Sequence, residues 1–166
     1  GSFLTDIDGE ARPMSTGWDI GADEAAPGAT ETLRVVSGTY TGNGQSGRAI
    51  PVGFQPDVVI VDSDQEAAIR TTSMGAGDVS KGMETAAAPT FGLISSRTTE
   101  GFTVGGFDAR VNQAGKSYHW VAFKAAPGSL VVGSYAGNGS SQTVSGVGFQ
   151  PEAVMVVSGG TGTPVF

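Results

Sequence analysis

Short runs of alternating apolar and polar residues, separated by glycine-rich turns, characterise the chain from residue 34 onward. The clearest is 117–124, in which Tyr118, Trp120 and Ala122 would share one face of a strand. Residues 57–62 contain a continuous apolar run, which predicts a core strand covered on both faces. Other strands are predicted at 35–40, 67–73, 91–96 and 101–104.

The segments between these runs have loop character. Residues 74–90 predict a loop with one helical turn near 79–85, and residues 105–116 predict a long polar hairpin loop. Pro56 cannot donate a backbone hydrogen bond, so we expect it at a strand start or a bend. Many short strands, frequent glycine turns and no amphipathic helical pattern favour an all-β fold, an antiparallel β-sandwich or jelly roll.

Two phrases recur along the chain with one common offset. Residues 38–44 (GTYTGNG) return at 133–139 as GSYAGNG. Residues 52–57 (VGFQPD) return at 147–152 as VGFQPE, with no gap between the two matches. A fixed internal period indicates an array of like modules. We therefore expect one complete module, the start of a second, and a segment of a longer tandem protein.

The first residues resemble the closing segment of right-handed parallel β-helix proteins. The resemblance lies in DIDGEARP at 6–13 and GWDIGADE at 17–24. It implies that residues 1–24 are the end of a β-helix domain, followed by a linker at 25–33 that is rich in Ala, Pro and Gly. The other expected boundaries are 34–126 for the first β-sandwich repeat and 127–166 for a partial second repeat.

The repeat itself resembles a β-sandwich module found in tandem in large secreted bacterial proteins and in phage tail fibres. The likeness is carried by YTGNG at 40–44, GFQP at 53–56, GFTVG at 101–105 and YHWVAFK at 118–124. That family has no settled biochemical activity. The resemblance therefore implies a fold and a context rather than a chemistry.

Composition narrows the classes of partner and compartment. The net charge is −7, and an acidic surface repels phosphate backbones, so no nucleic-acid partner is expected. No apolar run approaches the roughly 20 residues that cross a bilayer, so no membrane insertion is expected. The chain has no cysteine, which excludes disulfides and thiolate chemistry. The acidic, lysine-poor, Gly/Thr/Ser-rich composition favours an extracellular or cell-surface location.

Candidate chemistry is sparse. His119 is the one histidine, and triads and metal clusters usually need a histidine with partners, so we predict no catalytic residues and no enzyme. Tyr118 and Trp120 have two interpretations. They are core side chains of a packed strand, which is the commoner use of aromatic residues, or they form a flat platform for a sugar ring. On the second interpretation they are the candidate ligand-binding residues.

Carboxylates alternate at Asp62, Asp64 and Glu66 as at the opening of a calcium loop. However, Ala67 stands where that loop needs its turn glycine, and Ser73 where it needs a bidentate Glu. We therefore expect a solvated strand end, and predict no metal and no cofactor. Similar carboxylate groups occur near the N-terminus, where a structural Ca²⁺ stays open as an alternative: Asp6, Asp8 and Glu10, and separately Asp19, Asp23 and Glu24.

Asn43-Gly44 and Asn138-Gly139 are strong turn signals, because Asn and Gly both tolerate positive φ. A phosphate loop would need a following helix N-terminus and, in its commonest form, a lysine. Here a strand is predicted to follow, with no lysine. We predict hairpin turns that fix strand register in each module.

These observations favour a non-enzymatic extracellular structural or adhesive repeat, a stalk or fibre element that spaces or presents other domains. The alternative is a carbohydrate-binding module attached to a β-helix polysaccharide-degrading enzyme, and a weaker one is a phage tail-fibre segment. The expected partners are neighbouring modules or other copies of the chain, bound through exposed strand edges. If the chain is a carbohydrate-binding module, glycans are expected partners as well. Residues 130–166 would dock on the first module, pair with another chain by strand addition, or belong to a larger assembly.

Overall fold

A computed structural model describes residues 31–75, 79–84, 88–106 and 108–159. These residues lie almost entirely in the second of two units of the chain, Thr32–Phe166. The expected β-helix segment at 1–24 and most of the expected linker at 25–33 lie outside the described residues, so both stay predictions.

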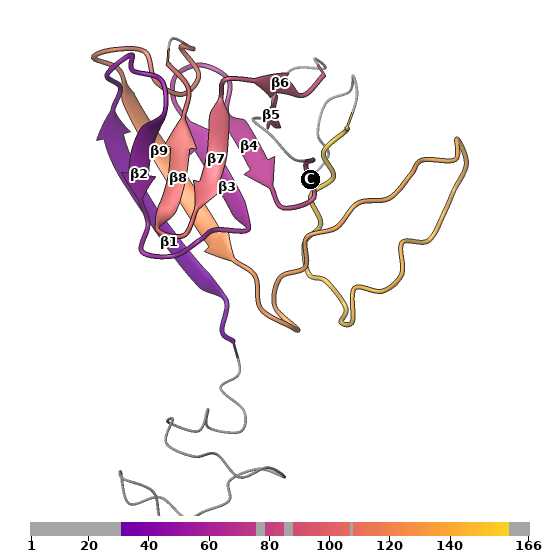
Figure 1. Ribbon diagram of the computed structural model, residues 1–166. Helices are drawn as coiled ribbons and strands as arrows, with labels where there is room; N and C mark the ends of the chain where they lie inside the picture. The colour runs from indigo at the N-terminus through magenta and orange to yellow at the C-terminus, as the bar shows by residue number, and fades with distance from the viewer. Residues whose placement is uncertain (1–30, 76–78, 85–87, 107, 160–166) are drawn as a thin grey trace, which may run out of the picture. The chain divides into compact units, whose positions relative to one another are not determined.

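The described part of the chain is all-β, as predicted, and it forms two antiparallel sheets without a helix (Figure 1). One sheet has six strands in the order β1-β9-β3-β4-β5-β6, and the other has three in the order β2-β8-β7. Two facing antiparallel sheets are the arrangement expected of a β-sandwich. The strands are β1 (Arg34–Thr41), β2 (Arg48–Pro51), β3 (Val58–Asp62), β4 (Ala68–Thr71), β5 (Val79–Gly82), β6 (Thr90–Phe91), β7 (Ile94–Thr98), β8 (Gly101–Val104) and β9 (Ser117–Lys124).

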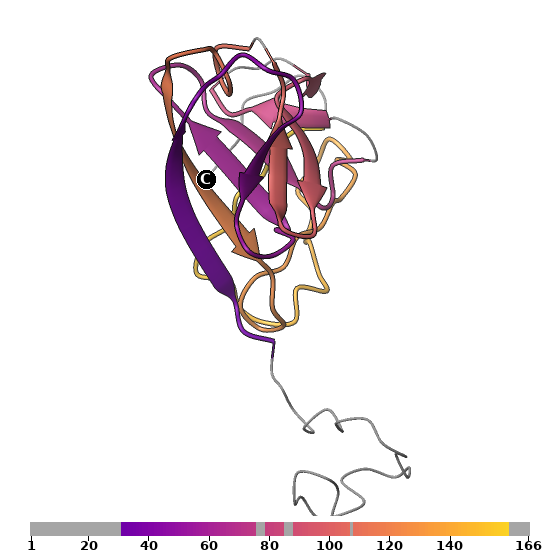
Figure 2. The ribbon, with the colours of Figure 1, turned by 60° about the vertical axis from the view of Figure 1, so that its left-hand side comes forward.

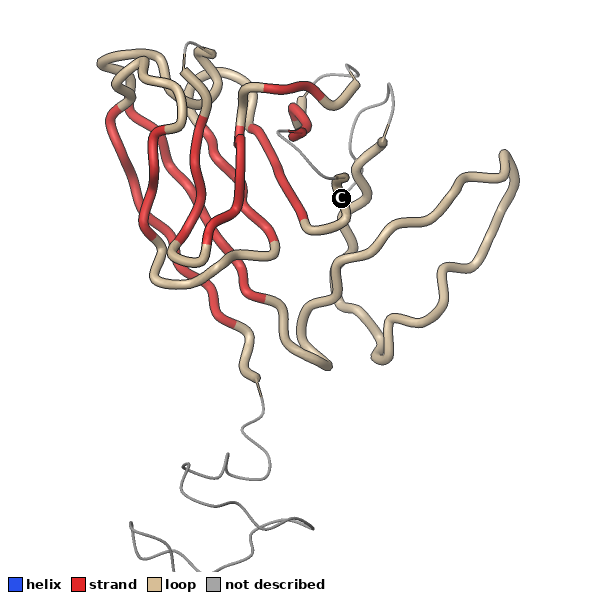
Figure 3. The backbone as a smooth tube through the Cα atoms, in the orientation of Figure 1, coloured by secondary structure: helices blue, strands red, loops and turns tan. Residues whose placement is uncertain are grey.

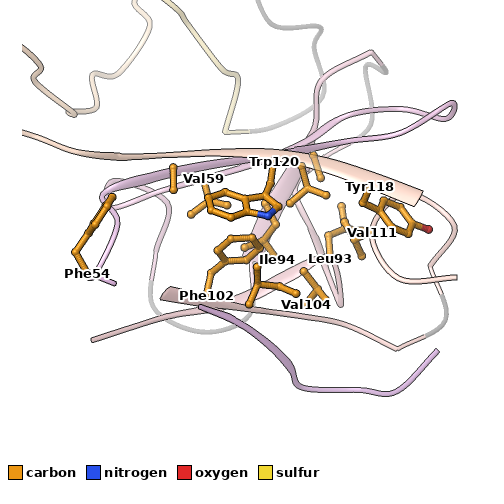
Figure 4. Close-up of a cluster of buried hydrophobic side chains, with 13 residues drawn as sticks. Phe54, Val59, Leu93, Ile94, Phe102, Val104, Val111, Tyr118 and Trp120 are labelled. Atoms are coloured by element: carbon orange, nitrogen blue, oxygen red, sulfur yellow. The ribbon is translucent and has the colours of Figure 1, made fainter. Parts of the chain in front are cut away.

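The hydrophobic core lies between the two sheets (Figure 4). Trp120 of the six-stranded sheet meets Phe102 of the three-stranded sheet edge to face, with ring centroids 5.7 Å apart. Such a pair adds about 0.5–1.5 kcal/mol beyond the apolar area that it buries. The other buried members of the cluster are Ile50, Phe54, Val59, Val61, Ala68, Leu93, Ile94, Val104, Val111, Tyr118 and Ala122.

Strand β9 matches its predicted bounds, and its alternation is confirmed. Tyr118 and Ala122 are fully buried, whereas Ser117 and His119 are exposed. β9 pairs with β1 along its whole length, from Arg34 opposite Lys124 to Thr41 opposite Ser117. β9 also pairs with β3, so it lies between these two strands.

Strand β3 is confirmed, but the predicted cover on both faces is complete on one face only. Val59 and Val61 are fully buried, while Val58 and Ile60 on the opposite face are only half-buried. The cause is the two-sheet architecture, in which the three-stranded sheet covers one face of β3. Pro56 lies just before this strand, as its missing N–H predicts.

Two local predictions are wrong because distant pairing decides the structure. The segment predicted as a helical turn near 79–85 contains strand β5, in which Lys81 pairs with Ile69 of β4. Residues 105–116 do not form a hairpin loop, since they connect β8 of one sheet to β9 of the other. Figure 3 shows this segment as a loop between strands of different sheets.

The Asn43-Gly44 turn is likewise not a hairpin turn. It follows β1 in the six-stranded sheet and leads to β2 in the three-stranded sheet, and these strands do not pair. Figure 2 shows the chain passing from β1 to β2 over one end of the module. Gly44 has φ 70°, but Asn43 does not have a positive φ, so the turn lacks the dihedral pattern of a type I′ hairpin.

Candidate functional site

The feature that organises this module is β9 together with the loop before it, residues 108–116. Trp120 lies opposite Gly38 of β1 and Val61 of β3. Tyr118 is 0% and Trp120 is 9% exposed. Both rings face the core, which removes the exposed aromatic platform that the carbohydrate interpretation placed at these two residues.

Two tyrosines attach the 108–116 loop to the sheet. The rings of Tyr40 and Tyr118 stack, with centroids 5.1 Å apart. The Tyr118 hydroxyl donates to the carbonyl oxygen of Ala109 at 2.8 Å and accepts from the Gln113 N–H at 2.9 Å. The Tyr40 hydroxyl donates to the carbonyl oxygen of Val111. Burial raises the pKa of Tyr40 and of Tyr118, so both hydroxyls keep the protons that they donate.

Two glycines of β1 and its following turn let this element approach closely. A Cβ on Gly38 would lie 2.7 Å from the Trp120 ring, and a Cβ on Gly42 would collide with the carbonyl oxygen of Gln113. Gly42 donates to the Lys116 carbonyl at 2.7 Å and accepts from the Gly115 N–H at 3.0 Å. The loop backbone thus lies directly against the end of β1.

Asn43 binds the loop rather than closing a hairpin. Its N–H donates to the side-chain oxygen of Asn112 at 3.0 Å, and Asn112 Nδ2 donates to Asn43 Oδ1 at 3.1 Å. Asn112 is fully buried, and its amide also donates to the carbonyl oxygen of Gln45 at 2.8 Å. Sequence analysis did not single out Asn112, because one Asn in a polar loop carries no periodic signal.

The carboxylates that resemble a calcium loop do not converge. Glu66 accepts a hydrogen bond from Arg110 at 3.1 Å, Asp64 forms an ion pair with Lys116, and Asp62 accepts from the Ser63 N–H at 2.8 Å. Within the described ranges, no group of three or more His, Cys, Asp or Glu residues could hold a metal ion.

Arg110 is the centre of an ion cluster that sequence analysis missed. Its guanidinium contacts Glu66 on one side and Asp108 on the other, with a 2.6 Å distance to Asp108 Oδ2. The hydrogen bond from Arg110 lowers the pKa of Asp108. Because Glu66 lies between β3 and β4, the cluster ties the 108–116 loop to a second part of the six-stranded sheet.

His119 lies on the outer face of the six-stranded sheet. It is exposed and occupies the register position between Thr39 of β1 and Asp62 of β3. Its strand neighbours Tyr118 and Trp120 point to the opposite face, so His119 is separated from the buried polar groups of the 108–116 loop.

Residues 130–157, which we call the second copy, keep the backbone geometry of residues 35–62 at two matching glycines and one Asn turn, but not at Gly146, whose φ of 86° stands where the first copy has Pro51. Gly139 and Gly148 have φ 75° and 84°, against 70° and 86° at the matching Gly44 and Gly53. In each copy an Asn side chain accepts from the N–H two residues later at 2.9 Å, at Asn43 and at Asn138. Asn138-Gly139 thus has the same local bend as Asn43-Gly44, and its role as a hairpin turn stays a prediction.

The second copy nevertheless forms no strand in the described chain beyond a single bridge residue, Val156. Several of its apolar side chains are open to solvent: Val131 is 48%, Tyr135 51% and Val154 59% exposed. Figures 1 and 3 show it as an extended loop, orange to yellow in Figure 1. An open hollow of about 460 Å³ lies at its base, lined by Ala125, Ala126, Pro127, Gly128, Leu130, Val131, Val147 and Gly148.

In the part of the chain that the structure describes, no helix is long and apolar enough to cross a membrane. No family model, no curated protein and no solved structure matches the chain.

Proposed function

We propose that this chain is a non-enzymatic structural repeat of an extracellular or cell-surface protein, an element that spaces or presents other domains. The observation that supports this most is the internal repeat. The same sequence phrases return with similar φ angles at two glycine pairs, Gly44 with Gly139 and Gly53 with Gly148, and with the same Asn-centred turn. A repeated unit whose retained positions are those that shape its backbone is typical of modular arrays.

The construction of the first module is consistent with this role. Its most specific polar contacts, at Tyr40, Tyr118, Asn43 and Asn112, hold one part of the module to another. Arg110 does the same through its carboxylate partners. These side chains serve the assembly of the module, and their polar atoms are directed at protein groups.

The carbohydrate-binding alternative receives no support from the aromatic residues that suggested it, since Tyr118 and Trp120 lie in the core. A glycan array with the whole chain tests that alternative directly. Saturable glycan binding would favour it over a purely structural role. The tail-fibre alternative is tested by the mass of the chain in solution, where a stable trimer would support it.

The proposed function is tested by the length of tandem arrays. Polypeptides with one, two and three linked copies of residues 32–131 are compared by small-angle X-ray scattering. A spacer module predicts that the maximum dimension increases with each added copy, and that no product is released from a panel of polysaccharides. Arrays that collapse to one constant dimension, or a specific hydrolase or lyase activity, would contradict the proposal.

A further inference from the structure

We propose that the second copy is an acceptor for an inserted β-strand of the β9 type. The occupant is an extended segment with a Tyr-x-Trp-x-Ala alternation, preceded by a loop that carries an Asn, as in residues 108–124. It would lie between residues 130–136 and 153–157, antiparallel to both. This inference deepens the proposed function. It rests on that proposal because it requires residues 130–157 to belong to a second module of the same kind.

At the core-facing positions of β1 and β3 that lie opposite β9, the two copies are identical. In the first copy Val36 lies opposite Ala122, Gly38 opposite Trp120 and Tyr40 opposite Tyr118. Val59 and Val61 of β3 lie opposite Ala122 and Trp120. The second copy has the same residue at each of these positions: Val131, Gly133, Tyr135, Val154 and Val156.

Positions that differ include the outward-facing ones of the same strands, where Ser37, Thr39 and Ile60, which also lie opposite β9, are matched by Val132, Ser134 and Met155. Ile50 of β2, a core residue that pairs with Phe102 of the three-stranded sheet, is matched by Ser145. Thr41, which is exposed and lies opposite Ser117 of β9, is matched by Ala136. The second copy therefore keeps the core-facing side chains opposite β9 but not Ile50, which pairs with β8. This favours the core face of the six-stranded sheet as the seat of the occupant.

Most of the seat is open in the structure, the exception being Val156, which forms a single bridge and is half-buried. A Cβ on Gly38 or Gly42 would strike the Trp120 ring or the Gln113 backbone, but nothing lies within 4 Å of a Cβ on Gly133 or Gly137. Where no neighbouring atom requires glycine, a glycine in an extended segment lowers the stability of the fold by roughly 0.5–1 kcal/mol relative to Ala. The presence of glycine at both positions is explained if a Trp ring packs on Gly133 and a loop backbone packs on Gly137.

The polar groups that would bind the loop before the inserted strand, those of Asn138 and Tyr135, are also present. Asn138 already holds the turn conformation in which Asn43 binds Asn112, because its side chain accepts from the Ser140 N–H as that of Asn43 does from Gln45. Tyr135 is 51% exposed, so its ring is free to stack as that of Tyr40 stacks on Tyr118. An occupant with Tyr and Asn at the spacing of Tyr118 and Asn112 would satisfy both.

The probe for this proposal is a labelled synthetic peptide of residues 108–124, added to the full 166-residue chain. Binding is followed by fluorescence anisotropy, and its location by hydrogen exchange. We expect saturable 1:1 binding, with slower amide exchange in residues 131–136 and 153–157. A peptide of the same composition in scrambled order is not expected to bind.

Single substitutions in the chain locate the peptide. Gly137→Ala is expected to weaken binding at least tenfold, because its Cβ would meet the peptide backbone as one on Gly42 would meet Gln113. Tyr135→Ala is expected to weaken it as well, through loss of the ring stack. Ser134→Ala is the matched control, since Ser134 matches Thr39 on the opposite face of the strand and should bind the peptide as the unaltered chain does.

Three outcomes would overturn the proposal. They are the absence of saturable binding, binding that Gly137→Ala leaves unchanged, and a chain that forms dimers through residues 130–157 without peptide, which would make a second copy the occupant. None of these affects the length of tandem arrays, so failure of the acceptor and failure of the proposed function are distinguishable.

Discussion

The close approach of Gly42 to the 108–116 loop makes a strong prediction about stability. Gly42→Ala should destabilise the chain, whereas Gly137→Ala at the matching position should not. A Cβ at residue 42 overlaps a backbone carbonyl oxygen, that of Gln113, which cannot rotate away as a side chain could. The loop must move, and it carries several hydrogen bonds with it.

The magnitude follows from the contacts at risk. They are Gly42 N–H to Lys116 O at 2.7 Å, Gly115 N–H to Gly42 O at 3.0 Å, and Gly44 N–H to Asn112 O at 2.9 Å. Each contributes about 0.5–1.5 kcal/mol, so loss of most of them costs roughly 2–3 kcal/mol. Replacing Gly by Ala returns about 0.4–1 kcal/mol through the unfolded chain, in both variants. The net expectation is a loss of about 1–3 kcal/mol for Gly42→Ala and a change near zero or slightly favourable for Gly137→Ala.

Urea unfolding monitored by circular dichroism measures both changes in the free energy of unfolding. The unfolding midpoint of Gly42→Ala should fall clearly below that of the unaltered chain, with little change in the slope against urea. Gly137→Ala should keep the midpoint of the unaltered chain. Equal midpoints for the two variants would refute the reasoning, because the two sites share local sequence and differ in the loop that covers one of them.

Three further predictions concern the core and the titrating groups. Trp120→Ala should lower the free energy of unfolding by about 3–5 kcal/mol in thermal or urea unfolding, and a loss below about 1 kcal/mol would contradict its place between the sheets. Because Arg110 lowers the pKa of Asp108 below its usual 3.8, stability should fall as the pH drops below that value, and urea midpoints of Arg110→Gln should depend less on pH there. Because burial raises the pKa of Tyr40 above its usual 10.0, stability should fall as the pH rises past 10.0, and Tyr40→Phe should flatten that fall in unfolding curves taken at high pH.

Strand positions could be predicted where the pattern is local. The alternation at 117–124 fixes both the strand and its buried face, because Tyr118, Trp120 and Ala122 recur with the period of a strand and carry enough apolar surface to select a side. β5 could not be found in this way. It is short and polar, and its Lys81 is fully buried through pairing and packing that involve distant residues.

Several of the contacts that hold the 108–116 loop to the sheet could not be predicted, because they join residues far apart in the chain. Asn43 meets Asn112 across a separation of 69 residues. Glu66 was considered as part of a calcium loop, but its partner is Arg110, 44 residues away. A local pattern of carboxylates does not reveal which distant cation neutralises one of them. The repeat is the exception, since comparing the chain with itself identified Gly42 and Gly137 as matching positions.

The register of β1 against β9 has a mechanical consequence. Arg34 lies directly opposite Lys124, so the polypeptide runs into and out of this module side by side at one end. Tension applied through the chain would pull these two strands apart like a zipper, and their hydrogen bonds would break one after another rather than all at once. Such a module should yield at low force, lengthen, and close again when the load is removed, which would make an array of them extensible rather than stiff.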